Sequence, residues 1–255
     1  MTQPRRYSDK PDKVYFFGTC LVDLLYPRAG LAGMQLLLHE GLEVIYPRNQ
    51  SCCGQPAYNS GYRNEARAVA RSQLACFAED YPIIVPSGSC ASMMHHNYPE
   101  LFKGEADEHT ACNFAARVYE LTEFLTRVLK IELQDLGAPV KVALHTSCSA
   151  RREMGVAGDH ESLLRQLDNV ELVEPSHKEE CCGFGGTFAV KHPVISAAMV
   201  EDKADNIIAA GAEQLVTGDC GCLMNISGHM AYRNSGPEGK HIADFIWERT
   251  HAADD

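Results

Sequence analysis

The sequence predicts an α/β protein made of two pseudo-repeated halves, each a parallel βαβαβ unit with cysteines at the carboxyl edge of its strands. The first observation is a Cys-Cys-Gly tripeptide at residues 52–54 that recurs at 181–183. The second is a lone cysteine ahead of each tripeptide, Cys20 and Cys148, with 31 intervening residues in the first half and 32 in the second. The third is the alternation of short apolar runs with helical patterns in both halves.

Each half contains three short apolar runs, partly β-branched, that are typical of buried strands. These runs cover residues 13–17, 42–47 and 83–85 in the first half, and 141–145, 170–175 and 215–217 in the second. Helical patterns fill the intervals at 31–38, 69–77, 163–167 and 198–208. A strand–helix–strand order with connections of this length implies right-handed crossovers between parallel strands.

A long amphipathic helix is expected to close the first half. Apolar side chains recur along one face of residues 114–128, and the pattern stops near Gly137 and Pro139. We therefore expect two domains, residues 1–137 and 138–255, and no low-complexity linker lies between them. The closeness of the two repeats predicts that the halves pack tightly across a pseudo-twofold axis.

Nine of the eleven cysteines follow the repeated spacing, and each comes just after a predicted strand. Because parallel strands present their carboxyl ends at one edge of a sheet, thiols that are remote in sequence should meet there. The candidate metal ligands are Cys20, Cys52, Cys53, Cys90, Cys148, Cys181, Cys182 and Cys222, with Cys220 open as a fifth thiol of the second half. The other two, Cys76 and Cys112, are expected to be small buried apolar residues.

The vicinal pairs favour an iron–sulfur cluster over zinc. Two adjacent cysteines bound to a single zinc ion would close a small, strained ring, whereas a cluster offers a separate iron to each thiolate. The glycines beside the pairs would let the backbone approach a cluster and turn N–H donors toward its sulfurs. These glycines are Gly54, Gly183, Gly185 and Gly186.

Composition and charge exclude several other classes of protein. The net charge of −11 argues against a nucleic-acid partner, which requires a basic surface. No apolar run reaches the length of a membrane span, and the polar first ten residues lack the apolar core of a signal peptide. An odd number of cysteines in a chain of 255 residues favours metal or thiol chemistry over disulfides, so we expect a cytoplasmic protein.

The pattern C-x₃₁-CCG-x₃₅-C, repeated as C-x₃₂-CCG, resembles the duplicated CCG domains of a known family. That family includes the cysteine-rich component of heterodisulfide reductase and the iron–sulfur subunits of glycolate and glycerol-3-phosphate dehydrogenases. The flanks at 17–20, 86–90 and 221–224 are most similar to its lactate-utilisation protein A branch. The resemblance implies a role in oxidising L-lactate to pyruvate together with lactate-utilisation proteins B and C.

The chain departs from the family at the last motif, which is normally C-x-x-C. Met93 lies three residues after Cys90, and Asp219 lies three residues before Cys222. Four thiols per half suit one [4Fe–4S] cubane in each half, whereas five would suit a non-cubane cluster. The flanking residues favour Cys222 over Cys220 as the counterpart of Cys90.

No catalytic residue is assigned from the sequence. Flavin and nicotinamide fingerprints are absent, so we expect an electron-transfer subunit rather than a complete dehydrogenase. The alternatives are a thiol–disulfide redox protein that uses the vicinal pairs and a non-enzymatic zinc-binding scaffold. Histidines near the cysteines are expected at the surface or behind the ligands, namely His95, His96, His145, His177, His192 and His229.

Overall fold

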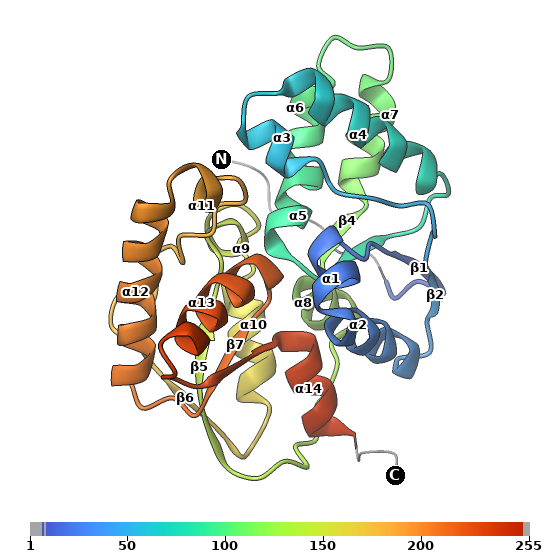
Figure 1. The fold of residues 1–255 in the computed structure, drawn as a ribbon. Coiled ribbons are helices and arrows are strands. Elements are labelled where there is room, and N and C mark those ends of the chain that lie inside the picture. Colours follow the sequence, from blue (N-terminus) through green and yellow to red (C-terminus); the bar gives the residue numbers. More distant parts are fainter. Residues whose placement is uncertain (1–6, 8, 252–255) are drawn as a thin grey trace.

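The computed structural model describes residue 7 and residues 9–251 (Figure 1). Most of the polar start of the chain, on which the expectation of no signal peptide depends, lies outside these residues. Two four-stranded parallel sheets form the framework, with strand orders β2-β1-β3-β4 and β6-β5-β7-β8. Because both sheets have the same order, the structure confirms the predicted α/β fold of two repeated units. No helix in the described ranges is long and apolar enough to cross a bilayer.

The first half consists of four strands with helices between them. Its elements are β1 (Lys13–Phe16), α1 (Cys20–Leu25), α2 (Pro27–His39), β2 (Glu43–Ile45), α3 (Gln55–Asn59), α4 (Arg63–Cys76), β3 (Ile83–Val85), α5 (Gly88–Ser92), the π-helical turn η1 (Met93–Asn97), α6 (Tyr98–Leu101), α7 (Glu108–Ala116), β4 (Val118–Glu120), α8 (Leu121–Glu123) and the π-helical turn η2 (Phe124–Leu129).

The second half repeats this order with fewer short helices. Its elements are β5 (Val140–His145), α9 (Cys148–Arg152), α10 (Ala157–Arg165), β6 (Val170–Val173), α11 (Phe188–Lys191), α12 (Pro193–Ala209), β7 (Gln214–Thr217), α13 (Cys220–Tyr232), β8 (Glu238–His241) and α14 (Ile242–Thr250). All six strands predicted from the apolar runs are present, and each central strand, β1 or β5, pairs in parallel with its two neighbours.

The single helix expected over residues 114–128 is wrong, because a strand interrupts it. Val118, Tyr119 and Glu120 are all buried and pair with β3 as strand β4. The Glu120 side chain then caps α8, and Glu123 completes a capping box with it. In the second half β8 occupies the same place, and His241 caps α14. Each half therefore has a fourth strand beyond the three that were predicted.

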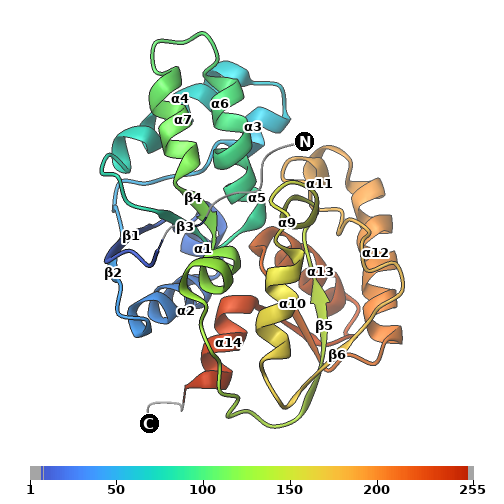
Figure 2. The ribbon, with the colours of Figure 1, turned by 180° about the vertical axis from the view of Figure 1, so that it is seen from behind.

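The two halves meet through equivalent elements. Helix α5 contacts α9, and α13 contacts α1 in the corresponding place. Helix α14 likewise packs on α2, while α10 packs on α8 and η2 (Figure 2). One continuous apolar cluster runs through this interface and joins side chains of both sheets, such as Phe16, Leu37, Val142, Leu163 and Ile246. The division at residue 137 stays a prediction, since the halves share this core.

One glycine shows how closely the halves approach. A Cβ atom on Gly88, at the start of α5, would lie 2.7 Å from Cβ of Ala150 on α9. Real side chains do not approach to this distance, so only glycine allows the α5–α9 contact. This contact brings the helices that carry Cys90 and Cys148 side by side.

Candidate metal centre

Four thiols converge in each half. In the first half, hydrogen bonds join Cys52 to Cys20 and to Cys53, and join Cys53 to Cys90. We call these four residues the first thiol set. They follow strands β1, β2 and β3, so the carboxyl edge of the sheet gathers them as the fold class requires.

The second half repeats this arrangement. Hydrogen bonds join Cys181 to Cys148 and Cys182, and the sulfurs of Cys182 and Cys222 lie 3.1 Å apart. We call Cys148, Cys181, Cys182 and Cys222 the second thiol set. The corresponding residues of the two halves therefore contact one another in the same order.

Helix starts position the lone cysteines. Cys20 and Cys148 are the first residues of α1 and α9, whose capping side chains, Thr19 and Ser147, accept backbone N–H bonds of 3.2 and 3.1 Å. Cys90 lies in the first turn of α5 and donates its own N–H to Ser87 at 3.3 Å. The caps thus hold each of these cysteines in the first turn of a helix at the carboxyl edge of its sheet.

The glycine after each vicinal pair has a backbone conformation that favours glycine. Gly54 has a φ of 86° and Gly183 a φ of 81°. The N–H of each glycine donates to the sulfur of the first cysteine of its pair, Cys52 or Cys181, at 3.4 Å. Gly185 and Gly186 also have positive φ, at 51° and 64°. The turn thus aims an N–H donor at a ligand sulfur in both halves.

Both thiol sets face one cavity of about 380 Å³, which we call the cysteine cavity. Residues from both halves line it, including all nine cysteines named above and Ser87, Ser147, Phe184, Val190 and Asp219. Cys222 contacts Cys182, whereas Cys220 is buried beside Val22 and Ala29 of the first half. This geometry favours Cys222 as the fourth member of the second set.

Comparison with known proteins agrees with this duplicated arrangement. The family model of the CCG cysteine-rich domain matches residues 14–95 and again residues 142–227. The chain belongs to the CCG cysteine-rich domain family.

Curated relatives of this family match nearly the whole chain. Lactate utilization protein A of Shouchella clausii is 45% identical over 236 residues, which cover 91% of this chain and 98% of that protein. Lactate utilization protein A 2 of Bacillus cereus strain Q1 is 40% identical, covering 92% of this chain and 97% of that one.

Among solved structures, a hypothetical protein from Helicobacter pylori shares the fold, with a TM-score of 0.66 at 12% identity. The match covers 97% of this chain and about half, 51%, of that one.

The contacts between the thiols of each CCG domain determine which of its cysteines loses its proton most readily. The thiols of Cys20 and Cys53 donate to Cys52 and lower its pKa to about 3. The thiols of Cys148 and Cys182 lower the pKa of Cys181 to about 2 in the same way. The pKa values of the donating thiols are raised by the same bonds. The hydrogen bonds within each set therefore favour the thiolate form of the first cysteine of its vicinal pair.

We expect Cys52 and Cys181 to be alkylated fastest in the metal-free protein. A lowered pKa keeps them as thiolates at neutral pH, so their rates with iodoacetamide should stay nearly constant from about pH 8 to about pH 5 and fall only toward their pKa values. Cys76, whose pKa burial raises, is the internal control and should react only in alkali. Peptide mass mapping under anaerobic conditions gives the rates; a common onset near pH 9 for all cysteines would contradict the assignment.

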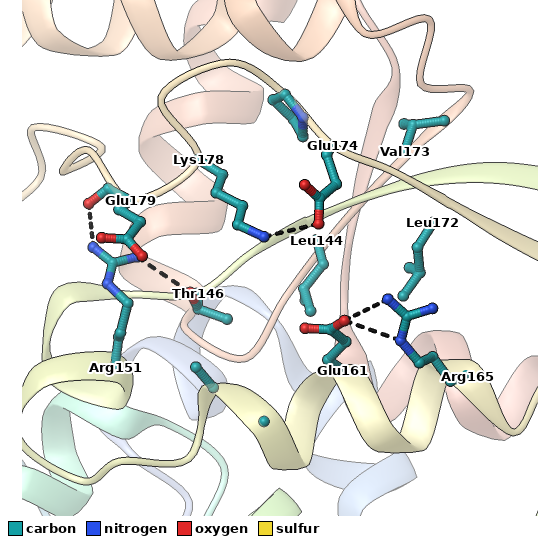
Figure 3. A pocket seen from close by; sticks show the side chains of 13 residues that line it. Leu144, Thr146, Arg151, Glu161, Arg165, Leu172, Val173, Glu174, Lys178 and Glu179 are labelled. Carbon is teal, nitrogen blue, oxygen red and sulfur yellow. Dashed lines mark hydrogen bonds and ion pairs between the residues drawn. The ribbon is translucent and has the colours of Figure 1, made fainter.

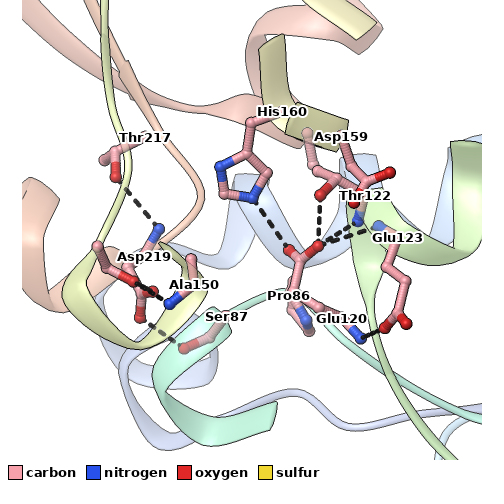
Figure 4. A network of polar contacts seen from close by, with 12 residues as sticks. Pro86, Ser87, Glu120, Thr122, Glu123, Ala150, Asp159, His160, Thr217 and Asp219 are labelled. Atoms are coloured by element: carbon pink, nitrogen blue, oxygen red, sulfur yellow. Dashed lines mark hydrogen bonds and ion pairs between the residues drawn. The ribbon is translucent and has the colours of Figure 1, made fainter. Parts of the chain in front are cut away.

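Asp219 links the two CCG domains and was not predicted as a functional residue. Its carboxyl oxygens accept from the hydroxyl of Ser87 at 2.7 Å (Figure 4). They also accept from the hydroxyls of Ser89 and Ser147 at 2.6 and 2.5 Å. Ser87 and Ser147 cap the helices that carry Cys90 and Cys148, and Asp219 immediately precedes α13 with Cys222. One buried side chain thus joins the starts of the three helices that carry Cys90, Cys148 and Cys222.

His145 is buried, which rules out the surface position that we considered for it. It ends β5 and is only 3% exposed, and its ligand nitrogen and the sulfurs of Cys182 and Cys222 all lie within 4.8 Å of one another. Neither ring nitrogen has a hydrogen-bond partner in the described part of the chain. Burial, assisted by the charge of Lys203, lowers the pKa of His145 to about 3, so the ring is neutral at physiological pH.

The other five histidines fit the expected position, at the surface or behind the ligands, better than His145 does. His96, His177 and His192 are exposed, and His95 and His229 are half-buried. His95 places Nδ1 2.7 Å from the carbonyl oxygen of Ala115. None of these five belongs to a described group of residues whose ligand atoms converge.

The two remaining cysteines lie outside both thiol sets. Cys76 is half-buried, and its sulfur donates to the carbonyl oxygen of Asn49 at 3.5 Å. The expectation that Cys112 is buried is wrong, because its side chain is exposed. Helix α7 buries Ala111, Phe114 and Ala115, and Cys112 lies on the opposite face.

A second cavity, of about 210 Å³, lies beside β5 and α10 and contains no thiol (Figure 3). Its cations already have acceptors: Arg165 pairs with Glu161 at 2.5 Å, and Lys178 pairs with Glu174 at 2.8 Å. Arg151 donates to the backbone carbonyl of Glu179. Since nearby acceptors use these charges, the cysteine cavity is the candidate site.

Proposed function

We propose that each thiol set holds one iron–sulfur cluster, of the [4Fe–4S] type, and that the chain transfers electrons in the oxidation of L-lactate to pyruvate. The observation that carries this proposal is the convergence of four sulfurs in each half, with Cys182 and Cys222 3.1 Å apart. The names of the curated relatives, which match over more than nine-tenths of both chains, support the link to lactate.

The donor set fits a cluster better than a single zinc ion. Both sulfurs of each vicinal pair turn into the same group of thiols, and a cluster provides separate irons for them. The N–H groups of Gly54 and Gly183 point at thiolate sulfurs, which offsets part of the negative charge that the four ligands bring together. When bound, an iron–sulfur cluster supplies one-electron redox chemistry.

The chain is proposed to work with partners. Oxidation of lactate to pyruvate removes two electrons and two protons, and the sequence contains no flavin or nicotinamide fingerprint that would take them as a pair. We therefore assign the chain as an electron-transfer protein that works with lactate utilization proteins B and C. Eleven free cysteines suit a reducing compartment, which supports a cytoplasmic location.

Metal analysis of anaerobically purified protein tests the cluster assignment. We expect brown protein with about eight irons and eight sulfides per chain, the content of two [4Fe–4S] clusters. Colourless protein with stoichiometric zinc would establish the scaffold alternative. Colourless protein without metal, in which air oxidises each vicinal pair to a disulfide, would establish the thiol–disulfide alternative.

The substrate is tested separately with the partner proteins. In a mixture of the loaded chain with proteins B and C, L-lactate should bleach the visible absorbance of the clusters. Glycolate is the matched control, because it differs from lactate by one methyl group. If glycolate bleached the clusters and L-lactate did not, the cluster assignment would stand, but the proposed substrate would change from L-lactate to glycolate.

A further inference from the structure

The two thiol sets have equivalent surroundings that can be matched residue by residue. A Cβ on Gly54 would lie 3.3 Å from the carbonyl oxygen of Ala66 on α4. A Cβ on Gly183 would lie 2.8 Å from the carbonyl oxygen of Ser196 on α12. Ala66 of the first half and Ser196 of the second are therefore equivalent residues. Residues that follow them by the same number of positions along α4 and α12 are equivalent too.

By this correspondence, Gln73 of the first half is equivalent to Lys203 of the second. Each lies seven residues after its reference residue, Ala66 or Ser196. Both are buried, with exposures of 0% and 1%. The Gln73 amide is neutral and bonds to Ser51, next to Cys52. The Lys203 Nζ donates to the carbonyl oxygens of residues 177 and 178 at 2.9 and 3.3 Å. Burial lowers the pKa of Lys203, and the positive charge of Lys203 opposes the rise in the pKa of Cys222.

Two more matched positions follow from aligning Cys20 with Cys148. Three residues earlier, the first half has Phe17, fully buried, where the second has His145. Three residues later, the first half has Asp23, which accepts from the Tyr46 hydroxyl, where the second has Arg151. At all three positions the second half is richer in positive charge or N–H donors.

We propose that the second thiol set provides the site of higher reduction potential, where an electron taken up by the chain comes to rest, and that His145 and Lys203 are the residues that raise it. This inference rests on the proposed function. Adding an electron makes a site more negative, and nearby cations and N–H bonds to its sulfurs stabilise that form. An imidazole carries at least one N–H in either protonation state.

The difference gives electron transfer within the chain a direction. When the first site gives one electron to the second, the first is oxidised and the second reduced by one electron each, and no proton is needed. Both thiol sets line the cysteine cavity, and no domain of the described chain lies between them. With a cluster bound at each thiol set, an electron received at the first set would move to the second, where His145 and Lys203 would stabilise it.

Redox titration of the anaerobic, cluster-loaded chain, followed by electron paramagnetic resonance, tests this inference. The wild type should show two separate midpoint potentials, and Cys53→Ser should remove the lower one. His145→Phe and Lys203→Gln give the second site the residues of the first. Each should lower only the upper midpoint and leave iron and sulfide content unchanged. The half-buried Arg151→Gln should produce a smaller shift in the same direction.

Two comparisons separate this effect from a general disturbance. His145→Asn and His145→Gln retain an N–H near the place of Nδ1 and Nε2, and one of them should restore the upper midpoint. His229→Phe removes a half-buried histidine seven residues beyond Cys222 on α13 and should change neither midpoint.

Several outcomes would overturn the inference. Equal midpoints in the wild type would do so, as would an upper midpoint unmoved by both His145→Phe and Lys203→Gln. Loss of the second cluster in His145→Phe would show that His145 is a ligand of the cluster rather than a hydrogen-bond donor to it. A wild type without iron would instead defeat the proposed function, so the two failures are distinguishable.

Discussion

Replacing Cys53 by serine is expected to halve the iron and sulfide content of the anaerobically purified chain. Cys53 is buried at the centre of the first thiol set, where hydrogen bonds join its sulfur to those of Cys52 and Cys90. A serine hydroxyl is a poor ligand for the soft metal of a cluster. Because the second thiol set has its own four sulfurs, it should keep its cluster, and Cys182→Ser should give the reciprocal result. Iron analysis and visible absorbance per chain measure both effects.

Cys76→Ser is the matched control for this experiment. It makes the same chemical change in the same half, at a cysteine that belongs to neither thiol set, and should leave the iron content unchanged. Loss of all iron in Cys53→Ser would mean one centre shared across the cysteine cavity instead of two. Full retention would remove Cys53 from the ligands.

Asp219→Ala is expected to lower the thermal midpoint of unfolding by about 8 °C. The substitution leaves the hydroxyls of Ser87, Ser89 and Ser147 without their buried acceptor. Hydrogen bonds to a charged group contribute about 1.5–3 kcal/mol each but are not additive, so we expect a loss of about 3 kcal/mol. For a chain of this size each kcal/mol shifts the midpoint by about 2–4 °C. Calorimetry of variant and wild type in the same metal state measures the shift.

Two further variants sharpen this result. Asp219→Asn keeps one acceptor oxygen and should fall between wild type and Asp219→Ala. Asp205→Ala removes an exposed carboxylate that pairs with Arg233 at 2.6 Å and should shift the midpoint by no more than about 1–2 °C. If Asp219→Ala behaved like Asp205→Ala, the serine network would have no role in holding the halves together.

The sequence was enough to predict six of the eight described strands and the meeting of the thiols. Buried parallel strands are continuous apolar runs, such as Ile83–Val85, and a duplicated spacing shows which cysteines belong together. Because the carboxyl ends of parallel strands share an edge, topology alone brings Cys20, Cys52 and Cys90 to one place.

The fourth strands were not predictable in the same way. Strand β4 has three residues, too few to interrupt the helical period of the apolar residues around it. Strand β8 reads Glu-Gly-Lys-His, without a single apolar side chain, and is held by pairing to β7 rather than by its own composition.

The surroundings of the site depend on contacts between residues far apart in the chain. Asp219 meets Ser87 across 132 positions, and nothing near either residue in sequence signals the contact. The burial of His145 follows from its place at the end of β5, close to Cys182 and Cys222 at the folded sheet edge. The exposure of Cys112 depends on the rotation of α7, which one cysteine in a short pattern does not determine.

The pairing of α5 with α9 and of α13 with α1 is the pattern of an isologous interface, in which one surface meets its own copy. A homodimer of single CCG domains would associate through this surface, so the fold has the form of such a dimer joined into one polypeptide. In a homodimer, any substitution appears in both copies at once. Gene fusion removes that constraint, and the exchanges of Phe17 for His145 and of Gln73 for Lys203 are differences that only a fused chain can hold.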